Sequence, residues 1–300
     1  MEHNIAPDAS FAFLKYGNSS SSSSSPDELS VKRDAYWSYC GPLLRGGEEE
    51  LPASLHEWAS AALSKSSALL PLLLPFLGFV NALVAGTGRL DHYWLTIRAT
   101  KATDEFDRPR WHTDDMFFTS DFFSGGAASG ETPSQHEEGS GQRQRQRQLD
   151  LETDWKVCGT LLGPATLFIP DAYQAVARDA QRATKQALAT DHACTSIRCV
   201  GCAATADGVR ARLGSDFARL GAVQAAPGEC AFFRIGHDGG AVHSEPSMSG
   251  GDRIFVNVVP GKEAELGRLV KKWGMDFPRS WWVAPHRAVR QQHRAAHGLE

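Results

Sequence analysis

Short segments rich in β-branched and aromatic residues constrain the fold of this chain more than any other feature. Each segment is bounded by Gly, Pro or Asp, as is typical of strands that end in turns. The segments are residues 92–100, 155–163, 165–170, 230–236 and 253–259. With helices between them and at their periphery, such strands predict a mainly β protein with a β-barrel or double-sheet jelly-roll core.

Three other stretches carry the spacing of peripheral helices. Residues 52–67 offer Ser54 as an N-cap, with Glu57 three positions later and an amphipathic pattern after it. Residues 172–189 place a stripe of small or apolar side chains on one helix face, and residues 264–273 form a third candidate. The stripe consists of Val176, Ala180, Ala183 and Ala187.

The apolar segment 68–85 reaches the length of a membrane span. Pro71, Pro75, Gly78 and Asn81 interrupt it, however, and no cluster of basic residues flanks it. We therefore expect a buried helix pair or a segment that lines the core, and no membrane association.

Two low-complexity stretches cannot bury enough apolar surface to become ordered. The first is the serine run 19–25, and the second is the stretch from about 125 to 148, which includes the sequence QRQRQRQ. We expect residues 1–30 to form a disordered tail and residues 31–290 to form one domain interrupted by a disordered loop at about 125–148. Residues 291–300 form a C-terminal tail in this interpretation.

Charge and cysteine content restrict the class of partner. A formal charge of −4 over 300 residues gives no basic footprint for nucleic acid or an anionic membrane, so a small-molecule partner is favoured. The six cysteines are unevenly placed, and the N-terminus lacks the charged and apolar regions of a signal peptide. These features predict a cytoplasmic protein with free thiols.

A cluster of potential metal ligands carries the functional signal. In an extended segment His112 and Asp114 point to the same face, because they are two residues apart. His243 ends one strand, and Arg253 opens the next. Two histidines and one carboxylate leave open positions on an octahedral metal, which suits Fe(II) that must bind a co-substrate and O₂. An arginine nearby can bind a carboxylate of that co-substrate through two parallel hydrogen bonds.

The pattern of His112-x-Asp114, His243 and Arg253 ten positions later resembles the Fe(II)/2-oxoglutarate-dependent oxygenases, which share a double-stranded β-helix core. The resemblance covers about residues 90–262. It implies that His112, Asp114 and His243 bind iron and that Arg253 binds the distal carboxylate of 2-oxoglutarate. The reaction would oxidise a C–H bond of a small molecule with O₂ and yield succinate and CO₂.

One departure from the family pattern concerns the co-substrate. Many members have Ser or Thr two residues after the arginine, whereas this chain has Phe255. Residues on predicted strands are candidates for the missing contact, but a shift of one residue in register would turn them to the other face. These candidates are Arg98, Lys156, Thr160 and Thr166.

The substrate is suggested only by a more distant resemblance. The serine and glutamine tracts resemble those of filamentous-fungal proteins, and the chain is similar to fungal oxygenases of amino-acid specialised metabolism, including some that close an aziridine on valine. This resemblance implies a free branched amino acid as substrate, with hydroxylation, ring closure or desaturation as the outcome.

Other residues allow different interpretations. His192, Cys194, Cys199 and Cys202 have donors dense enough for a tetrahedral zinc site, which would make the chain a non-catalytic, zinc-stabilised interaction protein. Cys199 and Cys202 could instead form a redox pair, or the thiols could simply be buried. A cupin-like metalloenzyme that needs no 2-oxoglutarate is a third possibility.

Residues next to the proposed ligands also have two interpretations. His237 and Asp238 could replace a ligand or line the substrate entrance, although their glycine-rich surroundings favour an exposed turn. An aromatic group next to the metal motif in the sequence is expected to pack in the core, with a hydrophobic wall beside the metal as the alternative. That group consists of Trp111, Phe117, Phe118, Phe122 and Phe123.

Overall fold

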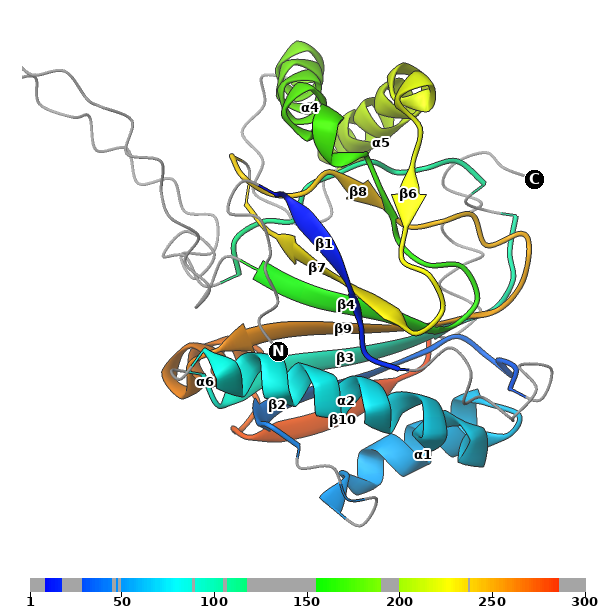
Figure 1. The fold of residues 1–300 in the computed structure, drawn as a ribbon, viewed down its shortest axis with the longest axis vertical. Coiled ribbons are helices and arrows are strands. Elements are labelled where there is room, and N and C mark those ends of the chain that lie inside the picture. The colour runs from blue at the N-terminus through cyan, green and yellow to red at the C-terminus, as the bar shows by residue number, and fades with distance from the viewer. Residues whose placement is uncertain are drawn as a thin grey trace, which may run out of the picture.

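Two antiparallel sheets form the framework of the protein (Figure 1). The structure is a computed structural model, and it describes residues 9–17, 29–44, 47, 50–87, 90–104, 107–117, 155–189, 200–236 and 238–285. The large sheet has seven strands in the order β1-β7-β4-β9-β3-β2-β10, and the small sheet has three in the order β6-β5-β8. The prediction of a mainly β protein with helices is therefore confirmed.

The strands of the large sheet are β1 (Phe11–Lys15), β2 (Ala35–Pro42), β3 (His92–Thr100), β4 (Trp155–Leu162), β7 (Glu229–Arg234), β9 (Arg253–Gly261) and β10 (Arg279–Val283). Those of the small sheet are β5 (Leu167–Phe168), β6 (Val223–Gln224) and β8 (His243–Ser244). The predictions for β3, β4, β7 and β9 are confirmed. The strand expected at 165–170 is shorter. The strand expected to end at His243 is β8, which begins at that residue, and the other four strands were not predicted.

Five α-helices and three short 3₁₀ turns complete the described chain. The α-helices are α1 (Ala53–Ala62), α2 (Leu69–Gly86), α4 (Gln174–Leu188), α5 (Val200–Asp216) and α6 (Glu263–Lys272). The 3₁₀ turns are η3 (Ser66–Ala68), η4 (Asp171–Tyr173) and η5 (Ala218–Leu220). Figure 1 shows α1 and α2 along one side of the large sheet, and α4 and α5 beyond the small sheet.

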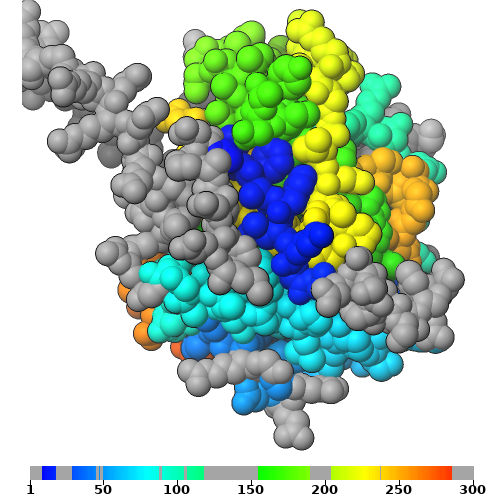
Figure 2. Space-filling view, viewed as in Figure 1, coloured from blue at the N-terminus to red at the C-terminus, as the bar shows by residue number. Residues whose placement is uncertain are grey.

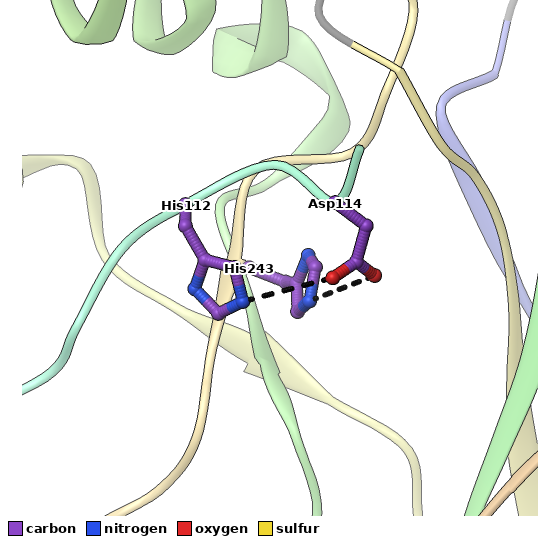
Figure 3. Close-up of side chains that lie close together, drawn as sticks. All are labelled: His112, Asp114 and His243. Carbon is purple, nitrogen blue, oxygen red and sulfur yellow. Dashed lines mark ion pairs between the residues drawn. The ribbon is translucent and has the colours of Figure 1, made fainter. Parts of the chain in front are cut away.

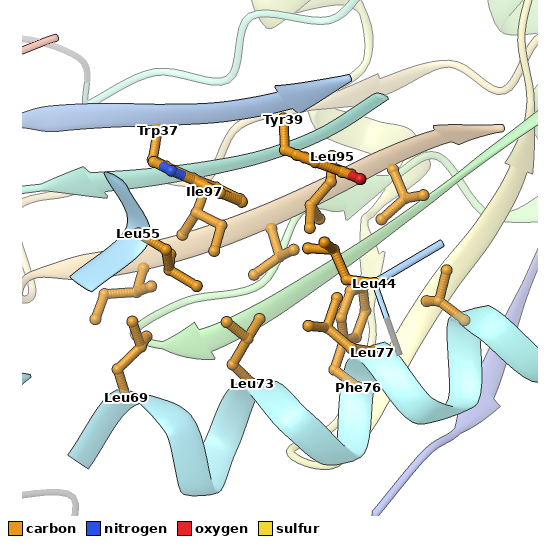
Figure 4. Packing of buried hydrophobic residues seen from close by; sticks show 14 of the residues in the cluster. Trp37, Tyr39, Leu44, Leu55, Leu69, Leu73, Phe76, Leu77, Leu95 and Ile97 are labelled. Atoms are coloured by element: carbon orange, nitrogen blue, oxygen red, sulfur yellow. The ribbon is translucent and has the colours of Figure 1, made fainter. Parts of the chain in front are cut away.

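The large sheet has one apolar and one largely polar face, because side chains alternate along each strand. On the apolar face, Trp37 of β2 and Leu95 and Ile97 of β3 are buried against Leu73 and Phe76 of α2 (Figure 4). The opposite face carries the polar side chains of the same strands. This division places the main hydrophobic core on the side of the sheet away from the small sheet.

Helix α2 contains residues 69–85 of the apolar segment as one continuous helix, and the prediction of a core-lining segment is confirmed. By length and composition alone, the stretch Ser66–Gly86 would suffice to cross a membrane. Pro71 lies in the first turn, where backbone N–H groups have no intrahelical acceptor, so the missing N–H of proline costs no helical hydrogen bond. Pro75 lies in the helix interior on the exposed side.

Strand β1 corrects the expectation that residues 1–30 are a disordered tail. It pairs antiparallel with β7, with Phe11 opposite Phe233. The rings of Phe11 and Phe13 lie 4.8 and 5.8 Å from that of Phe168, so this short strand gains aromatic packing at the sheet edge. Figure 2 shows β1 at the surface between α2 and the α4–α5 pair. The tracts 19–25 and 125–148 and the tail 291–300 lie outside the described residues.

Two details of the helix predictions are wrong. Pro52 is the N-cap of α1, and the Ser54 hydroxyl instead accepts a hydrogen bond from Trp37 Nε1 at 2.9 Å. The predicted apolar stripe of α4 contacts the core only at Ala180, since Val176 is 61% exposed and Ala183 and Ala187 are also exposed. Helix α4 is buried through a different face, formed by Gln174, Ala177 and Gln181. The helix at 264–273 is confirmed as α6.

The contact between α2 and β4 predicts opposite effects of two matched substitutions. A Cβ at Gly159 would lie 2.7 Å from the buried Phe76 ring, whereas a Cβ at Gly78 would meet nothing within 4 Å. Gly159→Ala is expected to lower the free energy of unfolding by about 1–3 kcal/mol through overpacking. Gly78→Ala should raise it by about 0.5–1 kcal/mol, because alanine favours the helix. Urea denaturation measures both; a Gly159→Ala variant as stable as the native protein would contradict this packing.

Candidate metal centre

Three potential ligands predicted from the sequence lie together at the small sheet (Figure 3). His243 opens β8, and His112 and Asp114 belong to the segment that follows β3. The possible ligand atoms of the three residues all lie within 4.8 Å of one another. Asp114 Oδ1 is 3.9 Å from His112 Nε2, and Asp114 Oδ2 is 3.5 Å from His243 Nε2. This His–Asp–His group is compatible with a metal site.

The backbone fixes the two histidines relative to each other. His112 N–H donates to the His243 carbonyl, and His243 N–H donates to the His112 carbonyl, each at 2.9 Å. The two residues therefore form an isolated antiparallel bridge, with their ring centroids 4.4 Å apart. The imidazole positions are consequently set by main-chain pairing, which does not depend on a bound ion.

Hydrogen bonds also fix which ring nitrogen can bind a metal. Nδ1 of His112 lies 2.8 Å from the Arg110 carbonyl, and Nδ1 of His243 lies 2.9 Å from the Ala241 carbonyl. A carbonyl can only accept a hydrogen bond, so Nδ1 carries the proton in both rings. Nε2 then has a free lone pair, and in both rings it is this atom that faces Asp114. Such outer hydrogen bonds are the usual way in which proteins orient metal-binding imidazoles.

The charges around Asp114 favour its ionised form. Burial alone would raise the pKa of this carboxyl, but the Lys156 ammonium, which contacts Oδ2, and then His243 and His112 lower the pKa to about 2. The pKa of His243 is lowered to about 4, chiefly by burial. At neutral pH the site therefore offers a carboxylate and, at His243, a neutral imidazole, which are the forms that bind metal.

A cavity of about 240 Å³ lies beside these residues, bounded by the polar face of the large sheet. Its wall combines aromatic rings with polar and charged side chains, as is typical of sites for small molecules. Beyond the three potential ligands, the lining residues are Tyr36, Trp94, Thr96, Arg98, Phe117, Lys156, Cys158, Thr166, Phe233, Glu245, Arg253, Phe255 and Asn257.

Arg253 lies in this cavity wall and is 5% exposed. Its Nε donates to the Pro164 carbonyl at 2.9 Å, and its Nη2 donates to the Thr166 hydroxyl at 3.0 Å. The guanidinium carbon also lies 4.3 Å from the centroid of the Phe255 ring. Burial lowers the pKa of Arg253 to about 10, so the side chain remains a cation at neutral pH.

The other co-substrate candidates differ in where they lie. Arg98, Lys156 and Thr166 line the cavity, whereas Thr160 is not among the lining residues. Thr160 is opposite Phe255 in the register of β4 and β9, next to an irregularity between Thr160 and Leu162. Because opposite residues of an antiparallel pair share a face, Thr160 lies on the cavity side of the sheet without reaching the cavity wall, and its role as a cofactor-binding residue stays a prediction.

Buried polar side chains of α4 support the site, and sequence reasoning missed them. Gln174 is 1% exposed; its Nε2 donates to the Ile169 and Val242 carbonyls at 2.7 and 3.2 Å, and its Oε1 accepts from Val242 N–H at 2.7 Å. Val242 directly precedes His243. Gln181 lies on the same helix face, 3.5 Å from the hydroxyl of Thr113, the residue between the other two potential ligands. In the sequence, the signal for this support was the presence of two glutamines seven positions apart, on one face of the expected helix.

Glu245 was also missed. It lines the cavity two residues after His243 and forms an ion pair with Arg110 at 3.6 Å. Burial alone would raise the pKa of Glu245, but the charges of His112 and Arg110 lower it. In the sequence, the signal for Glu245 was its position two residues after His243, since alternate residues of an extended segment share a face.

Several residues of the alternative interpretations are not part of this site. The Asp238 side chain is 99% exposed and lies 3.6 Å from Arg182. Trp111 is buried, with its ring 6.2 Å from that of Phe217, so the core-packing interpretation holds for it, whereas Phe117 lines the cavity. The remaining positions lie outside the described residues or, for Cys202, have no described side chain: Phe118, Phe122, Phe123, His192, Cys194, Cys199, Cys202 and His237.

The comparisons with known proteins add no assignment. No protein-family model matches this chain, and a search of curated proteins finds no match. The chemistry of the site must therefore be inferred from its geometry.

The Gln174 contacts predict a loss of metal affinity without any change to a ligand. Gln174→Ala would leave the Val242 N–H without its acceptor and the Val242 carbonyl with only its hydrogen bond from Ile169 N–H, which would loosen His243. We expect the dissociation constant for Mn(II) to rise about 10- to 100-fold. Gln186→Ala, at an exposed position of the same helix, is the matched control and should bind as the native protein does. Competition with a fluorescent chelator measures both constants; equal affinities would contradict a role for Gln174.

Burial of neutral His243 predicts a pH-dependent stability of the metal-free protein. The unfolded imidazole binds a proton below about pH 6.5, whereas the folded one resists protonation down to about pH 4. The stability that depends on neutral His243 is therefore fully present above pH 6.5 and is lost as the pH falls toward 4. Between pH 7 and 5 this group should remove about 2 kcal/mol from the free energy of unfolding.

Denaturation of chelator-treated protein at the two pH values measures this loss. His243→Gln should show a smaller decrease in the free energy of unfolding between these pH values. His56→Gln, at an exposed position of α1, should show the same decrease as the native protein. Equal decreases in native protein and His243→Gln would show that His243 is not the group responsible.

Proposed function

We propose that this protein is a non-haem Fe(II)- and 2-oxoglutarate-dependent oxygenase that oxidises a C–H bond of a small molecule. One observation supports this function best. The Nε2 atoms of His112 and His243 and the Asp114 carboxylate converge in a cavity whose wall also contains the buried guanidinium of Arg253. The cavity thus combines a ligand set for a metal with a cation for a carboxylate.

The donor set fits ferrous iron. Two imidazole nitrogens and one carboxylate are the ligands of non-haem Fe(II) oxygenases, and they leave positions free for further ligands. When bound, Fe(II) supplies the activation of O₂ that, together with oxidation of 2-oxoglutarate to succinate and CO₂, oxidises the substrate. The chain's own contribution is to hold the three ligand atoms, to orient both imidazoles through Nδ1 and to keep Asp114 ionised.

Arg253 and Thr166 are proposed to bind the distal carboxylate of 2-oxoglutarate. The Arg253 Nε is engaged with the Pro164 carbonyl, which orients the guanidinium while other N–H groups remain for a ligand. The Thr166 hydroxyl, 3.0 Å from Nη2, supplies the hydroxyl that the sequence lacks at Phe255. A guanidinium and a hydroxyl side by side suit a carboxylate with two oxygens.

Aromatic side chains are proposed to keep water from the reacting atoms. Phe117, Phe233 and Trp94 line the cavity, and the Phe117 and Trp94 rings pack edge to face with centroids 5.9 Å apart. The Lys156 ammonium lies 5.0 Å from the centroid of the Phe233 ring, close to Asp114. An apolar wall of this kind limits side reactions of an oxidising site.

We also infer that the two sheets are the two halves of an open double-stranded β-helix. The potential metal ligands belong to the small sheet and the segment bridged to it, while Arg253 begins a central strand of the large sheet. A cavity bounded by two antiparallel sheets is the arrangement expected of that fold. On the more distant resemblance stated above, the substrate is a free branched amino acid and the product is hydroxylated or ring-closed.

Production of succinate tests the function. Native protein reconstituted with Fe(II) without oxygen, and then given O₂ and 2-oxoglutarate with a panel of amino acids, is expected to form succinate. His112→Ala should lose stoichiometric iron and all succinate formation. Stoichiometric iron binding without succinate under any condition would rule out the proposed reaction and favour a metalloenzyme that needs no 2-oxoglutarate.

Two further variants test the co-substrate contacts. Hydrogen bonds to charged groups contribute about 1.5–3 kcal/mol each, so Arg253→Gln should raise the KM for 2-oxoglutarate about 100-fold and Thr166→Val about tenfold. Arg212→Gln, at an exposed position on α5, is the matched control and should leave this KM unchanged. A native KM in Arg253→Gln would contradict the assigned role.

A further inference from the structure

The Arg98 side chain differs from those of the other two cations of the cavity wall, because it has no ion pair or hydrogen bond with any of the described residues. Lys156 contacts Asp114, and Arg253 donates to Pro164 and Thr166. Within the described part of the chain no carboxylate forms an ion pair with Arg98, although its side chain lines the same cavity. Arg98 is also exposed whereas Arg253 is buried, so it lies where the cavity meets solvent.

The charges of the wall leave one positive charge unmatched once the proposed metal and co-substrate are bound. Among the described residues, three cationic side chains line the cavity, against the carboxylates of Asp114 and Glu245, with both histidines counted as neutral ligands. A divalent metal ion adds two positive charges, and doubly charged 2-oxoglutarate removes two. Glu245 is in addition already paired with Arg110. A third ligand that places a carboxylate beside the unpaired cation would therefore be favoured in this cavity.

A second polar group lies near Arg98 on the same face of the sheet. In the register of β3 and β9, Arg98 is opposite Phe255 and Thr96 is opposite Asn257. Arg98 and Asn257 are thus diagonal neighbours, and both line the cavity. Asn257 Oδ1 is buried and has no hydrogen-bond partner among the described residues. A buried acceptor without a partner is costly, and a donor on a bound ligand would satisfy it.

We propose that Arg98 and Asn257 form the substrate subsite of the cavity, for a small organic acid with an N–H or O–H donor near its carboxylate. Arg98 binds the carboxylate, and Asn257 Oδ1 accepts a hydrogen bond from the ammonium or hydroxyl group. Diagonal neighbours on adjacent strands lie about 7–8 Å apart, which one small molecule can span. This subsite rests on the proposed function, and it limits the substrate to amino or hydroxy acids.

Arg253 is the better site for the co-substrate and leaves Arg98 for the substrate. Arg253 is buried next to the Thr166 hydroxyl, whereas Arg98 has the Tyr36 ring opposite it on β2 and is open to solvent. The Phe255 side chain lies between the two cations. Its ring is stacked on the Arg253 guanidinium, and Phe255 is opposite Arg98 in the register of β3 and β9. Two separate carboxylates can therefore be held in one cavity.

Matched acids and amides test the subsite. L-Alanine, L-valine, L-leucine and L-phenylalanine, each with its amide and its deaminated acid, are titrated calorimetrically into anaerobic Mn(II)-loaded protein, with and without 2-oxoglutarate. At least one amino acid is expected to bind at least tenfold more tightly than its amide. Arg98→Gln should abolish that preference, and Arg98→Lys should retain part of it. Asn257→Ala should reduce the preference for the amino acid over its deaminated acid.

The controls separate this subsite from the co-substrate site. Arg98→Gln should change the dissociation constant of 2-oxoglutarate less than twofold, and Arg212→Gln should bind every compound as native protein does. The subsite is overturned if no amino acid binds more tightly than its amide to native protein, if Arg98→Gln keeps the preference, or if Arg98→Gln weakens 2-oxoglutarate binding instead. Failure of the proposed function is a different result, in which native protein neither binds 2-oxoglutarate nor forms succinate.

Discussion

The reciprocal backbone hydrogen bonds between His112 and His243 are the interaction on which the rest of the site depends. They join a segment that follows β3 to the first residue of β8, although the two histidines are far apart in the sequence. Because the carbonyls of Arg110 and Ala241 then orient the rings, the direction of each Nε2 follows from the main chain. The site is therefore organised before any ligand arrives, which lowers the cost of binding one.

The two faces of the large sheet have different roles: one packs in the main hydrophobic core, and the other bounds the cavity. The apolar face of the sheet, packed against α1 and α2, contains most of the buried hydrophobic side chains. Its other face contains cations that would be costly if left alone in a protein interior. The most deeply buried of them are compensated locally, Lys156 by Asp114 and Arg253 by a carbonyl and by Thr166. Among the described residues that line this cavity, Arg98 at its open end is the one cation without such a partner.

Local patterns predicted what depends on local sequence, and missed what depends on tertiary contacts. Strand β3 was predicted with its correct bounds, because its residues favour strands strongly and turn residues flank it. Strand β1 was missed because it is short and becomes ordered through an edge partner and Phe168. The stripe of α4 was wrong because this helix packs through polar contacts of Gln174, which no hydrophobic periodicity reveals. Likewise, the candidate ligands follow from spacing, whereas the pairing of Arg253 with Thr166 requires the fold.

Lys156 joins the two ends of the chain segment that carries the low-complexity tract. Asp114 and Phe117 lie near the end of the described chain before residues 118–154, and Lys156 is the second described residue after them. Its ammonium contacts the Asp114 carboxylate and lies 6.0 Å from the centroid of the Phe117 ring. Since this contact holds both ends beside the potential metal ligands, a change in the length of the intervening sequence should have little effect on the geometry of the site.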